Sequence, residues 1–244
     1  RRKEGKSFKV WKSKYSAVGN YIGGNLYTVI GGSGRGKSIL TLEDAIYLAK
    51  QGANVIIWAM ELGWYEEMVR IYTSISGDSK VRKISADDLP DIMDVEGSID
   101  GGFDASGMRI GGLDTPQEQK LREFLRNFNE RIDGNIIVRA VDDEDFVDRS
   151  IKALERDIDE YNIDVAVIDP FYYMDYEKNR GRTTGGDAAE TSRKLRSMAG
   201  RKGIVAIALT QTSDKSEEDD GDGTRELKPP SRESVTSTKR LLQD

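Results

Sequence analysis

Five short apolar segments recur along the chain, and this pattern constrains its fold more than any other feature. Each segment is nearly continuous in apolar residues, mainly Val, Ile and Ala, without regular alternation of apolar and polar positions. The segments are Leu26–Ile30, Val55–Met60, Ile136–Val141, Val165–Asp169 and Ile204–Thr210. Continuous apolar strands of this kind are typical of a parallel sheet that helices cover on both faces.

Amphipathic segments lie between these runs and predict helices. In the third of them, Val147, Ile151, Leu154, Ile158 and Tyr161 recur three and four residues apart and predict one apolar stripe. The predicted helices are Ile39–Lys50, Trp64–Ser76, Phe146–Tyr161 and Asp187–Lys202. Strands that alternate with helices in this order predict an α/β fold, a mainly parallel sheet with crossover helices on both faces.

The composition limits the chemistry that the chain can perform. Its 244 residues include no cysteine and no histidine, which excludes disulfide frameworks, thiolate zinc sites and Ser-His-Asp triads. The net charge of -6 argues against a generally polybasic nucleic-acid binder, although a local basic groove remains possible. No apolar run is long enough to cross a membrane and no signal-peptide core is present. We therefore expect a soluble, cytoplasmic protein without a membrane partner.

One segment matches the phosphate-binding pattern G-x-x-x-x-G-K-[ST] in full: Gly31-Gly32-Ser33-Gly34-Arg35-Gly36-Lys37-Ser38. It follows a predicted strand and precedes a predicted helix. The glycines allow a tight turn whose amide hydrogens point at phosphate oxygens, and the helix adds the positive end of its dipole. Lys37 is expected to reach the β- and γ-phosphates, and the Ser38 hydroxyl to bind Mg²⁺. The pattern predicts a nucleoside triphosphate site.

Three polar residues end or follow other predicted strands. Asp169 ends one strand, where an acid is expected near the water shell of Mg²⁺. Glu61 directly follows Val55–Met60 and is a candidate base for the water that attacks the γ-phosphate, or else an acid that caps the helix near Trp64. Gln211 follows the last strand, where an amide can both donate to and accept from a phosphate, although a polar residue at a strand end is also ordinary.

Together these motifs resemble the ATPase domain of the DnaB-like replicative helicases of superfamily 4, which has a RecA-like P-loop core. The resemblance runs in the same order and rough spacing from about Ser16 to Asp244. The matching segments are GGSGRGKS, NVIIWAMEL, VAVIDPFYYM, ETSRKLRSMAGRKGIVAIALTQTS and PPSRESVTSTKRLLQD. The phosphate loop alone is shared by many ATPases, and the later segments favour this family among them. They are the helix pattern E-x-x-R-x-L-x-x-x-A, the strand with Thr-Gln that follows it, and then R-E-S and Q-D.

The resemblance implies roles for the residues of the predicted nucleotide site, with ATP and Mg²⁺ as cofactors. Lys37 and Ser38 would contact phosphate and metal, and Asp169 would belong to the metal shell. Glu61 would activate water. Gln211 would couple the nucleotide state to DNA.

The resemblance also implies partners. Arg232, Glu233 and Ser234 resemble the family's channel loop that holds single-stranded DNA. The chemistry is consistent with this role, because a basic residue and backbone amides can hold phosphates without reading sequence. The alternative for Arg232 is an exposed surface arginine. A homo-hexamer is expected, and a primase and a helicase loader are candidate partners. Because many phages encode such helicases, a viral origin and the host cytoplasm remain open.

The expected organisation is a basic linker or arm at 1–15 and one motor domain at 16–244. The family's last strands, with the basic residues that reach a neighbour's nucleotide, would follow Asp244, so we expect an isolated or trimmed motor domain. Two stretches have no chemistry of their own: an insertion at about 77–135, whose glycine-rich part 97–112 predicts a hairpin or mobile loop, and an acidic loop at 214–222.

Three functions are compatible with the sequence. The leading one is an ATP-driven hexameric DNA helicase that translocates on single-stranded DNA and unwinds duplex. The second is a RecA-like recombination or repair ATPase that does not unwind, and the third is a nucleotide-dependent switch or loader. The helix before Gln211 and the Arg232 segment favour the first.

Overall fold

A computed structural model describes residues 8–77, 103, 105–113, 115–178 and 186–211, together with the backbone of 82–85 and 98–101. Its centre is a five-stranded sheet in which every neighbouring pair is parallel. The strand order is β3 (Asn25–Gly31), β9 (Val205–Gln211), β8 (Val165–Asp169), β4 (Asn54–Ala59) and β7 (Asn135–Ala140). The predicted α/β fold is confirmed, and each predicted strand lies within one residue of its expected bounds.

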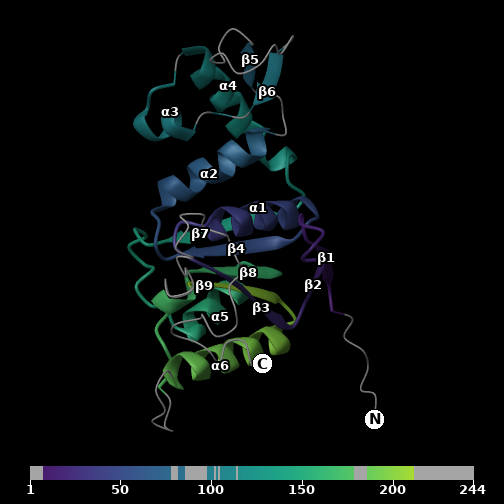
Figure 1. Cartoon of the computed structure of the whole chain (residues 1–244), viewed down its shortest axis with the longest axis vertical. Helices are drawn as coiled ribbons and strands as arrows, with labels where there is room; N and C mark the ends of the chain where they lie inside the picture. Colours follow the sequence, from purple (N-terminus) through teal and green to yellow (C-terminus); the bar gives the residue numbers. More distant parts are fainter. Residues whose placement is uncertain are drawn as a thin grey trace, which may run out of the picture.

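Helices cover both faces of this sheet (Figure 1). On one face lie α1 (Lys37–Lys50) and α2 (Trp64–Gly77), and on the other lie α5 (Ile151–Glu160) and α6 (Gly186–Lys202). Successive strand residues supply the two core layers in turn: Val55 and Ile57 pack towards the first pair of helices, Ile56 and Trp58 towards the second. This explains why the strands are continuously apolar in the sequence.

The strand register brings distant segments to one edge of the sheet. In the parallel ladder, Gly31 at the end of β3 is paired with Gln211 at the end of β9. Ala59 at the end of β4 is paired with Asp169 at the end of β8, and the Met60 amide donates a hydrogen bond to the Asp169 carbonyl (2.8 Å). The carboxyl ends of four neighbouring strands therefore meet.

One helix differs from the prediction. The stripe from Phe146 to Tyr161 predicted a single helix, but α5 begins at Ile151. Ser150 caps it by accepting a hydrogen bond from the Ala153 amide (3.3 Å). The Val147 side chain is 81% exposed rather than part of the stripe, so its position in the spacing is coincidental.

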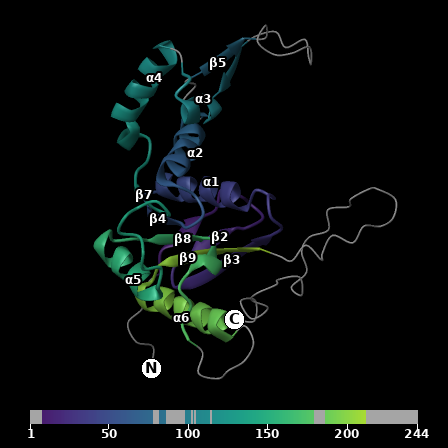
Figure 2. The ribbon, with the colours of Figure 1, turned by 90° about the vertical axis from the view of Figure 1, so that its left-hand side faces the viewer.

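The insertion lies beyond α2, away from the sheet (Figure 2). It contains an antiparallel pair, β5 (Arg82–Ser85) and β6 (Ser98–Gly101). The glycine-rich part 97–112 therefore supplies one strand of this pair and a helix, and not the hairpin that we predicted within it. The helices α3 (Ala105–Ile110) and α4 (Thr115–Arg126) were not expected. Their buried side chains include Met108 and Phe124.

A short hairpin of β1 (Val10–Lys12) and β2 (Asn20–Ile22) precedes the sheet. It is fixed to α1 through the buried Asp44, whose carboxylate accepts hydrogen bonds from the Ser13 hydroxyl (2.8 Å) and the Tyr21 hydroxyl (2.7 Å). Part of the segment that we assigned to a linker or arm thus contacts the helix that follows the phosphate loop. None of the helices in the described ranges is long and apolar enough to cross a membrane.

Candidate nucleotide site

The phosphate loop leaves β3 and enters α1 through two glycines in left-handed backbone conformations. Gly34 has φ of 68° and Gly36 has φ of 78°, values that side-chain-bearing residues adopt only at a cost. Gly36 is the N-cap of α1, which has no side-chain cap and no acidic residue in its first turn. The first amides of α1 therefore remain available to an anion, and the helix dipole favours one there.

Lys37 folds back over its own loop. Its Nζ donates a hydrogen bond to the Gly32 carbonyl (2.7 Å), and the side chain lies close against Gly31. The Lys37 side chain is half-buried. Burial lowers the pKa of Lys37, while the charges of Asp169 and Glu61 act in the opposite direction. Its ammonium group is thus held in place before any phosphate arrives.

Asp169 and Ser38 lie next to each other. Burial raises the pKa of Asp169, and a hydrogen bond from the Ser38 hydroxyl is the largest effect that opposes the rise. A hydroxyl beside a carboxylate offers the hard oxygen ligands that Mg²⁺ prefers. The described part of the chain contains no group of three or more acidic side chains that could hold a metal ion. Mg²⁺ is usually held by one or two protein ligands together with waters and substrate phosphates.

Glu61 is exposed and lies just beyond the end of β4. The alternative role, a cap for the next helix, belongs to a different acid. Asp142, in the loop after β7, accepts a hydrogen bond from the Trp64 amide at the start of α2 (2.7 Å). A Cβ atom at Gly63 would come within 2.8 Å of the same carboxylate, which explains the glycine there.

A cavity of about 260 Å³ brings most of these residues together. Of the residues singled out from the sequence, those that line it are Ser33, Gly34, Arg35, Gly36, Lys37, Ser38, Glu61, Asp169 and Gln211. Gly31 and Gly32 are not among the residues that line the cavity, but they contact the side chain of Lys37, which does line it. Arg232, Glu233 and Ser234 lie outside the described residues, as does the acidic stretch 214–222.

Three polar residues that line the cavity were not foreseen from the sequence: Glu67, Arg70 and Tyr172. Glu67 and Arg70 are one turn apart on α2, so they share a helix face. Tyr172 follows Asp169 by three residues; burial raises its pKa to about 12, and the Glu61 charge adds to the rise. An arginine on the helix that follows the candidate base Glu61 was a usable signal for Arg70. The burial of Glu67 was not, since it depends on packing.

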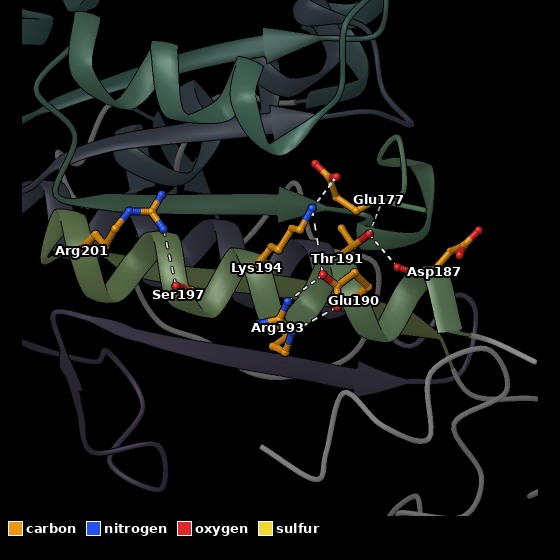
Figure 3. Close-up of polar contacts among 8 residues, drawn as sticks. All are labelled: Glu177, Asp187, Glu190, Thr191, Arg193, Lys194, Ser197 and Arg201. Carbon is orange, nitrogen blue, oxygen red and sulfur yellow. Dashed lines mark hydrogen bonds and ion pairs between the residues drawn. The ribbon is translucent and has the colours of Figure 1, made fainter. Parts of the chain in front are cut away.

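The segment that carries Tyr172 is fastened to α6 (Figure 3). The Thr191 hydroxyl accepts a hydrogen bond from the Glu177 amide (2.7 Å), and Lys194 pairs with the Glu177 carboxylate (2.7 Å). Glu190 and Arg193, which mark the E-x-x-R pattern, pair with each other (2.7 Å) on the outer face of the helix. The segment is therefore held by Thr191 and Lys194, whereas Glu190 and Arg193 of the pattern pair with each other.

Comparison with solved structures identifies the architecture. The chain is similar to a DnaB-like replicative helicase whose structure was described with its interactions with primase, with a TM-score of 0.62 and 16% identity over 91% of this chain and 46% of that one. It is also similar to a second solved structure, described as an ATPase domain, with a TM-score of 0.61 and 16% identity over 90% of this chain and 66% of that one. The fold is that of a RecA-like ATPase domain.

The chain spans about half the length of the first of these proteins and about two thirds of the second. No protein-family model matches the sequence, and no curated protein matches it. At 16% identity the likeness establishes the RecA-like fold, while any role of individual residues rests on the geometry above.

Proposed function

We propose that this chain is the motor domain of an ATP-dependent DNA helicase, which hydrolyses Mg-ATP to translocate on single-stranded DNA and unwind duplex. The observation that carries the proposal is the cavity at the carboxyl edge of the sheet. There a glycine-rich phosphate loop, the Ser38–Asp169 hydrogen bond, Glu61 and Gln211 lie around one space.

The phosphates of ATP are bound by the loop. Amides of residues 33–38 and the start of α1 donate to phosphate oxygens, and Lys37 leaves the Gly32 carbonyl to pair with the β- and γ-phosphates. Ser38 and Asp169 would hold a Mg²⁺ ion, which would neutralise charge on the same phosphates. Asp169 acts through its carboxylate and Ser38 through its hydroxyl.

Hydrolysis needs a base and cations on the developing charge. Glu61 accepts a proton from water while the water oxygen bonds to the γ-phosphorus, and the bond from that phosphorus to the bridging oxygen breaks to release ADP. Arg70 lines the cavity from α2 and brings a positive charge from within the same subunit. From the sequence we expected such charge to come from a neighbouring subunit.

The DNA-related roles extend the proposal beyond the described residues. Gln211 ends β9 and lines the cavity, so it is placed to relate the presence of the γ-phosphate to the segment that follows it. Arg232, Glu233 and Ser234, in that following segment, are proposed to hold the single-strand backbone. A homo-hexamer is the proposed assembly, with primase and a loader as candidate partners.

Steady-state ATP hydrolysis, with and without single-stranded DNA, tests the proposal, and Lys37→Ala is the control for a contaminating ATPase. We expect hydrolysis that DNA stimulates and that is lost in the control. Hydrolysis without any response to DNA would favour a nucleotide-dependent switch. Strand displacement on a forked duplex then separates a helicase from a recombination or repair ATPase, which would not unwind.

A further inference from the structure

An acidic residue is buried in the wall of the cavity. Glu67 is 6% exposed and lines the same space as the phosphate loop, although a site for a triphosphate should exclude a negative charge. The neighbouring Glu66 is exposed and does not line the cavity. The position of Glu67 therefore reflects the packing of one face of α2.

The Glu67 carboxylate has an incomplete set of partners. No hydrogen bond to it is found among the described residues; its contact is an ion pair with Arg70, at 3.9 Å between Oε2 and Nη1. This separation exceeds hydrogen-bond length, so the pair is loose. Burial raises the pKa of Glu67 to about 7, with Arg70 opposing the rise and Asp169 and Glu66 adding to it. A buried carboxylate held so weakly is costly.

Arg70 is placed to interact with more than one negatively charged group. Its side chain is only 25% exposed and its guanidinium pairs with Glu67, yet its charge also lowers the pKa of Asp169 across the cavity. An arginine has several donors in a rigid fork, and one long contact leaves most of them unused. A phosphate group entering this space would offer closer and stronger acceptors than the carboxylate does.

We propose that Glu67 is a positioning residue: it holds Arg70 inside the empty cavity and yields it to the terminal phosphate when a nucleoside triphosphate binds. The proposal rests on the proposed ATP site. It adds to that function a way for the site to distinguish a triphosphate from a diphosphate, through the Glu67–Arg70 ion pair. With a diphosphate bound, Arg70 remains with Glu67. With a triphosphate bound, the ion pair is exchanged, and Glu67 competes with the γ-phosphate for the same guanidinium.

The test uses isothermal titration calorimetry at pH 8 to measure the affinity of the chain for two ligands. One is the Mg²⁺ complex of a non-hydrolysable ATP analogue, and the other is Mg-ADP. Glu67→Gln removes the competing charge and preserves the shape of the side chain. We expect the ATP analogue to bind about five- to tenfold more tightly to this variant, as a coupling of ordinary size predicts, and ADP affinity to change less than about twofold. Arg70→Gln alone should reduce the preference for triphosphate by about fivefold or more.

The double variant with Glu67→Gln and Arg70→Gln identifies the route of the effect. Because the proposed competition acts through Arg70, the gain from Glu67→Gln should vanish in the Arg70→Gln background. Glu66→Gln is the matched control and should bind both nucleotides like the wild type. Thermal melts verify that each variant is folded.

Equal tightening for both nucleotides, an unchanged gain in the double variant, or no gain at all would overturn the role of Glu67 while leaving the ATP site intact. A wild-type chain that binds neither nucleotide would instead overturn the proposed function, and this inference with it.

Discussion

The burial of Glu67 has a consequence for stability that does not require any ligand. Its pKa is raised from 4.5 to about 7 in the folded chain. The folded state therefore binds a proton more tightly than the unfolded state does, and stability is lost as pH rises between these two values. The difference between these two pKa values corresponds to about 3 kcal/mol. Above pH 8, ionised Glu67 destabilises the fold by that amount.

Glu67→Gln removes this dependence, because an amide does not ionise. We expect the variant to gain stability over the wild type as pH rises, with about 2 kcal/mol of the total difference developing between pH 5.5 and 8. For a chain of this length the full 3 kcal/mol would correspond to roughly 6–12 °C in melting temperature. Urea unfolding, followed by tryptophan fluorescence at several pH values, measures the difference.

The difference between the two unfolding curves isolates Glu67, since other titrating groups are common to both proteins. Glu66→Gln is the control: its carboxylate is exposed, so the offset from the wild type should be nearly constant with pH. Parallel stability curves for wild type and Glu67→Gln would refute the reasoning. They would mean that the Glu67 carboxylate is solvated or fully paired in solution.

Four further outcomes are expected. Lys37→Ala should abolish ATP hydrolysis with an unchanged circular dichroism spectrum, and near-normal turnover would contradict the phosphate-loop assignment. Glu61→Gln should bind Mg-ATP and lose about 10²–10⁴-fold in turnover, whereas a collapse of ATP affinity would make Glu61 structural or a metal ligand. Arg232→Ala should lower the slope of log K against log salt for single-stranded DNA by roughly 0.7 per lost phosphate contact, and unchanged binding would move the DNA loop elsewhere. Ser150→Ala should cost about 0.5–2 kcal/mol in urea unfolding while Val147→Ala costs less than about 0.5, and equal losses would contradict the observed start of α5.

Part of the site follows from the sequence because its requirements are local. A phosphate loop needs glycines at particular backbone conformations, and Gly34 and Gly36 carry them. A doubly covered parallel strand must be apolar on both faces, so the strands that end in Asp169 and precede Glu61 are visible as continuous runs.

Periodicity alone was a weaker guide. The predicted helix began at Phe146, five residues before the observed start of α5. The Phe146 ring packs edge-on against Trp58 (4.9 Å between centroids) from outside the helix. An apolar residue just before a helix can therefore serve the core without belonging to the helix, and the capping residue Ser150 was the better marker of the start.

The sequence by itself determined the α/β class, the phosphate loop and the acids and amide that end its strands, because each depends on neighbouring residues. Tertiary structure alone decided that β9 pairs with β3. This pairing places Gln211 beside Gly31, although the two residues are far apart in the sequence. It also decided that Asp142 rather than Glu61 caps α2, and that Glu67 is buried beside Arg70. Strand order and the burial of a charge are properties of surfaces brought together from separate elements, and no local pattern encodes which surfaces will meet.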